Sequence, residues 1–149
     1  MNASHFWSQF FWLFVQGLDI VVALPKIRLA FMLSIIGLLV SIAWQNPFGR
    51  GLWKRYYSAV FAQFLFYPAI IAIGVLYRTG NPFQRLPRLN PFVEWTLYVL
   101  FGLSLLSGLF WVFRMRGLRW FALCLLVLQQ ILIFGALFVA EMSITGDWL

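Results

Sequence analysis

Charged side chains are scarce in this chain. Of its 149 residues, 11 are Lys or Arg and 4 are Asp or Glu, whereas 63% are hydrophobic. A soluble domain has about a quarter of its residues charged, because polar side chains must cover its surface. The composition therefore excludes a soluble enzyme and a disordered tail. The length suits a single domain, and we predict that residues 1–149 form one all-α integral membrane domain.

Chemically reactive side chains are equally scarce. The chain has 1 His, 1 Cys and 4 acids, too few to build a nucleophile–base pair or a metal centre. His5 is a weak candidate ligand for a metal or a pigment, but a bis-His haem needs a second His. Cys124 has no partner for an internal disulfide. We expect no enzymatic activity and no cofactor held by the chain's own ligands. Contact with a pigment, haem or quinone bound by neighbouring subunits stays open.

Four apolar runs are long enough to cross a bilayer as helices. About 20 residues suffice, and the runs cover residues 29–45, 57–77, 92–113 and 120–140. Their interiors hold no charge, and Glu94 lies within the first turn of the third run. Pro68 lies near the middle of the second run, where it should kink the helix because it lacks an amide donor and crowds the preceding turn. The sequence thus predicts a bundle of four transmembrane helices.

The stretch at residues 5–24 is ambiguous. It is long enough to span a bilayer, but its polar residues fall within about 100° of one another on a helix. These residues, called here the polar stripe, are His5, Ser8, Gln9, Gln16, Asp19 and Lys26. A narrow polar stripe on an aromatic-rich helix is typical of an amphipathic helix that lies in the membrane interface or rests on another protein. We favour an N-terminal interfacial helix and keep a fifth span as the alternative.

The cations form short clusters between the apolar runs, as in loops at a membrane surface. One side of the membrane holds cations without acids, which we expect to bind lipid headgroups: Arg50, Lys54, Arg55, Arg114, Arg116 and Arg119. The other side holds Lys26 and Arg28 in a connecting loop, three further arginines and all four acids. The all-basic side favours the cytoplasm, which places the C-terminus outside. We expect a bacterial cytoplasmic membrane, no cleavable signal peptide and no nucleic-acid binding.

Small and polar residues recur at helical spacing within the runs. They are Ser34, Gly37 and Ser41 in the first run and Ser104 and Gly108 in the third. Such residues let helix backbones approach closely in lipid, where apolar burial does not drive association. Gln129 and Gln130 lie at the centre of the fourth run. We expect their amides to bond to other helices.

With hardly any chain outside the apolar runs, we expect the protein to act through its surface. The favoured hypothesis is a non-catalytic subunit that supports a larger membrane complex, such as a respiratory, photosynthetic or transport assembly. It would brace partner subunits, shield lipid or a cofactor between them, and dock through the polar stripe, in which Gln9, Gln16 and Asp19 are the residues to replace in a test. The alternative is a self-contained homo-oligomeric carrier, or a lipid- or quinone-binding protein, that uses a cavity near Pro68 together with Gln129 and Gln130.

Overall fold

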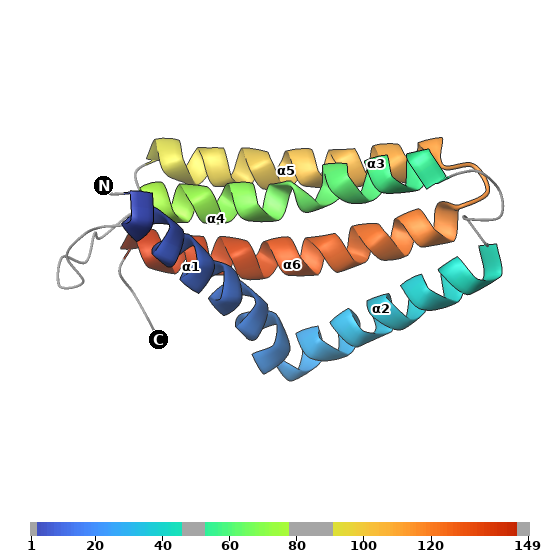
Figure 1. Cartoon of the computed structure of the whole chain (residues 1–149), viewed down its shortest axis with the longest axis horizontal. Coiled ribbons are helices and arrows are strands. Elements are labelled where there is room, and N and C mark those ends of the chain that lie inside the picture. Colours follow the sequence, from blue (N-terminus) through green and yellow to red (C-terminus); the bar gives the residue numbers. More distant parts are fainter. Residues whose placement is uncertain (1–2, 46–52, 78–90, 146–149) are drawn as a thin grey trace.

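A computed structural model describes residues 3–45, 53–77 and 91–145 of the chain. These ranges form six helices and no strand (Figure 1). In chain order the helices are α1 (Ala3–Ala23), α2 (Pro25–Gln45), α3 (Trp53–Phe64), α4 (Phe66–Leu76), α5 (Pro91–Arg114) and α6 (Arg119–Thr145). The all-helical prediction is confirmed for this part of the chain, and Arg50 lies outside it.

Five stretches are long and apolar enough to cross a membrane, which is consistent with a multi-pass membrane protein. Four of them correspond to the predicted runs, with α3 and α4 sharing the second. The fifth, Ser4–Ala23, is α1. This helix packs against α4 and α6, where Leu13, Gly17 and Val21 are buried. The structure therefore contains the fifth long apolar helix that the sequence analysis kept as its alternative.

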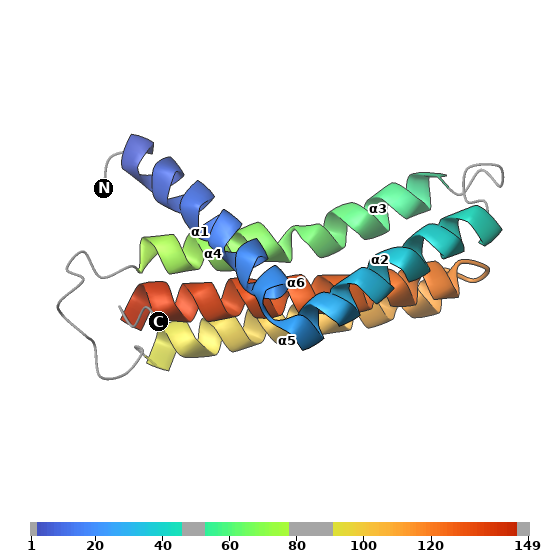
Figure 2. The ribbon, with the colours of Figure 1, turned by 90° about the horizontal axis from the view of Figure 1, so that it is seen from below.

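Helix α6 is the centre of the bundle. It contacts each of the other five helices, and 56% of its most apolar 18-residue stretch is buried. Figures 1 and 2 show α6 running beside α4 and α5, with α1 and α2 crossing it on another side. The corresponding window of α2 is only 11% buried. The hub of the fold is thus the last helix, and α2 lies at its edge.

The helix break expected from Pro68 lies at Leu65, three residues before the proline. Pro68 has no amide hydrogen for the carbonyl of Phe64, and its ring crowds the preceding turn. The bonds from the Leu65 amide to the Phe61 carbonyl (3.2 Å) and from the Ala69 amide to the Leu65 carbonyl (3.3 Å) carry the chain across the break. Helices α3 and α4 together therefore make one passage along the bundle (Figure 1).

Helices α1 and α2 form a V whose point lies beside the middle of the bundle (Figures 1 and 2). The sequence analysis places Lys26 and Arg28 in a surface loop, and this is wrong because α2 begins at Pro25. Proline suits the first helical position, and the Arg28 amide already donates to the Leu24 carbonyl at 2.8 Å. Both cations therefore lie in the first turn of a helix, at the point of the V.

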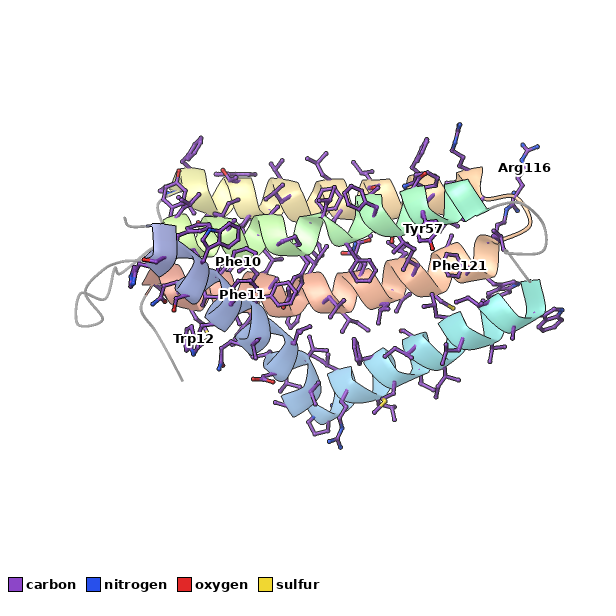
Figure 3. All side chains as sticks on the ribbon, in the orientation of Figure 1. Phe10, Phe11, Trp12, Tyr57, Arg116 and Phe121 are labelled. Atoms are coloured by element: carbon purple, nitrogen blue, oxygen red, sulfur yellow. The ribbon has the colours of Figure 1, made fainter. Side chains whose placement is uncertain are left out.

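Among the described residues, the two ends of the bundle carry different charges; Arg78, Arg85 and Arg88 lie outside these residues. The basic end holds Arg114, Arg116 (labelled in Figure 3) and Arg119 and, in the first turn of α3, Lys54 and Arg55. Glu94 in the first turn of α5 and Glu141 near the end of α6 lie at the opposite end. Helix α1 begins at this acidic end and α6 finishes there (Figure 1).

Candidate functional site

The most polar part of the interior lies where α3, α5 and α6 meet. Gln63 is fully buried and Gln129 is 1% exposed. The Nε2 atom of Gln129 donates a hydrogen bond to the backbone carbonyl of Gln63 at 2.8 Å. This carbonyl belongs to the last turn of α3, next to the helix break at Leu65. Gln129 therefore joins α6 to the end of α3.

The same region contains amide atoms without a protein partner among the described residues. They are both side-chain amide atoms of Gln63 and the Oε1 atoms of Gln129 and Gln130. Unpaired polar groups in a low-dielectric interior are unfavourable by about 1 to 3 kcal/mol each. We call Gln63, Gln129 and Gln130, with Ser104, the polar centre.

Helix α5 meets the polar centre through Ser104 and Gly108. The Nε2 atom of Gln130 donates to the Ser104 hydroxyl at 3.2 Å, which joins α6 to α5. A Cβ atom at Gly108 would overlap the Cδ1 atom of Leu126. The Leu126 side chain therefore occupies the space that a side chain at position 108 would need. The structure brings together Ser104, Gly108 and Gln130, which the sequence analysis named separately.

Two close approaches on α6 were missed by the sequence analysis. A Cβ atom at Gly135 would overlap the backbone carbonyl oxygen of Gly17 in α1, and one at Gly74 in α4 would lie 2.9 Å from the Cα atom of Ala140. The Ser143 hydroxyl adds a bond to the Gly74 carbonyl at 3.3 Å. Gly135 and Ala140 are small residues of α6 that face neighbouring helices. The recurrence of small residues in the fourth run could have predicted these close approaches.

The small face of α2 points at α6 but leaves space. A Cβ atom at Gly37 would lie 3.0 Å from the Sγ atom of Cys124. Ser34 and Ser41 are buried, yet their hydroxyls bond to carbonyls of their own helix, those of Ala30 (2.8 Å) and Gly37 (2.7 Å). A cavity of about 300 Å³ remains between the two helices, with Trp44 and Trp120 among its lining residues.

Helix α1 is attached to the bundle through the face that contacts α4 and α6. The Tyr67 hydroxyl donates to the Phe14 carbonyl at 2.7 Å, and the two rings meet edge to face with centroids 4.7 Å apart. The polar stripe lies away from this contact. His5, Ser8, Asp19 and Lys26 are exposed, while Gln9 and Gln16 are half-buried. Exposed aromatic side chains lie on the outer surface of α1, namely Trp7, Phe11 and Trp12. Figure 3 shows Trp12 on the side of α1 away from α4, whereas Phe10 is directed toward α4 and packs against the core.

The cations proposed for lipid headgroups are placed at the basic end. Arg114, Arg116 and Arg119 are all exposed, and the Arg114 guanidinium lies 5.7 Å from the centroid of the Phe110 ring. An arginine over an aromatic ring can still reach a headgroup phosphate while its stem covers apolar surface. Nothing is described of the Lys54 and Arg55 side chains.

Within the described ranges, no group of three or more His, Cys, Asp or Glu residues is placed to hold a metal ion. His5 lies on the exposed side of α1. No family model, curated protein or solved structure matches this chain. The arrangement offers hydrogen-bonding amides inside, a polar stripe outside and cations at one end. These groups can hold helices, lipids or a small ligand.

Proposed function

We propose that the chain is a non-catalytic, multi-pass membrane subunit that structurally supports a larger membrane complex. The proposal rests on the outer face of α1. Helices α4 and α6 cover one side of α1, while its other side presents the polar stripe beside exposed aromatic side chains. Polar side chains that face lipid are unfavourable. A helix of another subunit that carries amide or charged groups would cover them.

The outer surfaces of α2 and α5 support the same proposal. The most apolar windows of these helices are 11% and 17% buried. Such surfaces suit partner helices, or lipid and cofactor shielded between subunits, in a respiratory, photosynthetic or transport assembly. Helices α4, α5 and α6 would then brace α1 and α2 against those partners.

The first experiment is to tag the C-terminus and solubilise the native membrane with a mild detergent. The particle is sized, its chains are identified by mass spectrometry and its visible absorption is recorded. We expect a particle much larger than this chain, containing other membrane subunits. A colourless particle composed of this chain alone would overturn the proposal.

The docking face is tested by replacing Gln9, Gln16 and Asp19 together with Ala. None of the three is fully buried, so the chain should still fold, and we expect it to leave the complex during purification. The matched control replaces Ser34 and Ser41 with Ala, because their hydroxyls bond within α2 on the side that faces α6. Retention of the triple variant in the complex would exclude the polar stripe as the docking surface.

A second candidate is a self-contained carrier or a lipid- or quinone-binding protein that acts as a homo-oligomer. The unpaired amide atoms of the polar centre favour it, because a bound molecule could supply their missing partners. Replacing both Gln129 and Gln130 with Leu separates the two candidates. A loss of transport or ligand binding in a folded protein would support the carrier, whereas weaker assembly alone would support the subunit.

The clusters of cations without acids at the basic end support an orientation. The basic end, with Arg114, Arg116 and Arg119, would face the cytoplasm of a bacterial cell and contact anionic headgroups. The C-terminus would then lie outside, since α6 ends at the acidic end. A C-terminal tag that is cleaved by protease added to intact spheroplasts would support this orientation, and protection of the tag would reverse it.

A further inference from the structure

Two cations lie exposed at the point of the V, where α1 ends and α2 begins (Figures 1 and 2). They are Lys26 and Arg28, both in the first turn of α2. Within the described ranges, neither side chain forms an ion pair, and the nearest acid along the chain is Asp19 on α1. The backbone amides that begin α2 add partial positive charge at the same place. The point of the V therefore carries unbalanced positive charge on its surface.

Contacts on either side of the point place it beside α6, away from both ends of the bundle. Before the point, Gly17 of α1 lies against Gly135 of α6, and after the point Gly37 of α2 lies against Cys124. Each of α1 and α2 is long enough to span a bilayer alone. In the structure, however, the two helices together run from the acidic end of the bundle to the basic end (Figure 1).

The level of Lys26 along the bundle follows from a groove that it lines together with Gln130 of α6. Gln130 lies 11 residues after Arg119 and 15 residues before Thr145, the two ends of α6. Because a helix rises 1.5 Å per residue, about 15 Å or more of helix separates this level from either end. Long side chains reach headgroups from positions near helix ends. A bilayer that surrounds α5 and α6 would therefore hold both exposed cations at hydrocarbon depth.

The charge at this depth indicates what covers the point of the V. Ionisable groups inside a membrane are unfavourable unless they are paired or face a water-filled cavity. A second copy of this chain would bring one acid, Asp19, together with its own Lys26 and Arg28, so two copies would keep an excess of positive charge. Lipid phosphates lie at the headgroup level. A helix of another subunit can place a carboxylate at the required depth.

We propose that the point of the V docks a transmembrane helix of a partner subunit that carries Asp or Glu at the level of Lys26 and Arg28. This inference rests on the proposed function and specifies the chemistry of the partner. The Arg28 guanidinium can hold a carboxylate through two parallel N–H bonds, and the Lys26 ammonium can donate to the same group. Exposed apolar side chains beside the cations, Val22, Leu24 and Leu29, would meet the apolar surface of the partner helix.

The test treats native membranes with dicyclohexylcarbodiimide, which enters the hydrocarbon layer. The reagent adds to a carboxyl group and forms an O-acylisourea. The Lys26 amine, after losing its proton, attacks the acyl carbon, forms an amide and releases dicyclohexylurea. We expect mass spectrometry to find this amide between Lys26 and an Asp or Glu within a transmembrane segment of another chain. Lys26→Arg is the matched control, since it keeps the charge but removes the amine: the link should disappear while the partner stays in the complex.

The second measurement is the amount of partner recovered with the C-terminally tagged chain. Replacing Lys26 and Arg28 together with Gln should lower this amount by about tenfold or more, because the partner carboxylate would lose both cations. Both side chains are exposed, so the chain itself should still fold. Lys26→Arg combined with Arg28→Lys keeps both charges and should retain the partner. Arg116→Gln removes an exposed cation at the basic end and should leave the recovery within about twofold.

The outcomes separate this inference from the function on which it rests. A particle composed of this chain alone would overturn both. A complex in which the folded double Gln variant keeps its partners would overturn this inference and leave the supporting role in place. The same holds if wild-type membranes give no link to Lys26, or if Lys26 is linked only to Asp19 of a second copy.

Discussion

Helices α6 and α2 are both apolar and both carry small residues at helical spacing, yet they are buried to very different extents. Of the most apolar stretch of each helix, 56% is buried in α6 and 11% in α2. Small residues of α6 meet backbone or glycine on the neighbouring helix, as Gly135 does at Gly17. Those of α2 meet a side chain tip, as Gly37 does at the Cys124 sulfur. A small face packs tightly in lipid only where its partner is also small.

The largest effect on stability is expected when Gly135 of α6 is replaced by a larger residue. A Cβ atom there would overlap the Gly17 carbonyl and lie 2.8 Å from the Cγ2 atom of Val21. Because the Gly17 atom is backbone, α1 has to move as a whole. We expect Gly135→Ala to lower the free energy of unfolding by about 2 to 3 kcal/mol, measured by denaturant titration in mixed micelles.

The control for this variant is Gly102→Ala in α5. No atom lies within 4 Å of the position that its Cβ would take, so only helix propensity changes, in favour of the folded state by up to about 1 kcal/mol. If Gly135→Ala were as stable as Gly102→Ala, the contact between α1 and α6 would not be the close approach described above.

The next largest effect is expected at the polar centre. Gln129→Leu removes the buried bond that joins α6 to the Gln63 carbonyl of α3. Interhelical bonds of this kind contribute about 0.6 to 1.7 kcal/mol in membranes, and we expect a loss of about 1 kcal/mol in the same titration. Ser41→Ala is the control, since the Ser41 hydroxyl bonds within its own helix. Equal effects of the two changes would contradict a special role for bonds that join helices.

Sequence reasoning found the helices because length and apolar content determine them. It also placed the break near Pro68, since a missing amide donor acts locally. Its Gln129 and Gln130 lie at the centre of the bundle, where both amides donate to neighbouring helices. Each of these features depends on the composition of a single segment, so each can be predicted from that segment alone.

The close approaches and the V of α1 and α2 depend on two segments at once. A glycine such as Gly17 is uninformative until its partner Gly135 is known. Pro25 is compatible with a loop and with the first turn of a helix, and the structure places it in the first turn of α2.

The smallest effect on stability is expected at Gly37 of α2. A substitution there directly tests whether α2 is packed less tightly on the bundle than α6. Cys124 is half-buried and lies against Gly37, so its reaction with a maleimide reports whether α2 stays on α6. Gly37→Leu should push α2 outward and raise the labelling rate of Cys124 several-fold, while the free energy of unfolding changes by less than about 1 kcal/mol. Ala43→Leu adds the same bulk on the exposed side of α2 and should alter neither quantity. A loss of stability at Gly37→Leu as large as that at Gly135→Ala would mean that α2 belongs to the packed centre, and that its low burial is a property of shape and not of weak attachment.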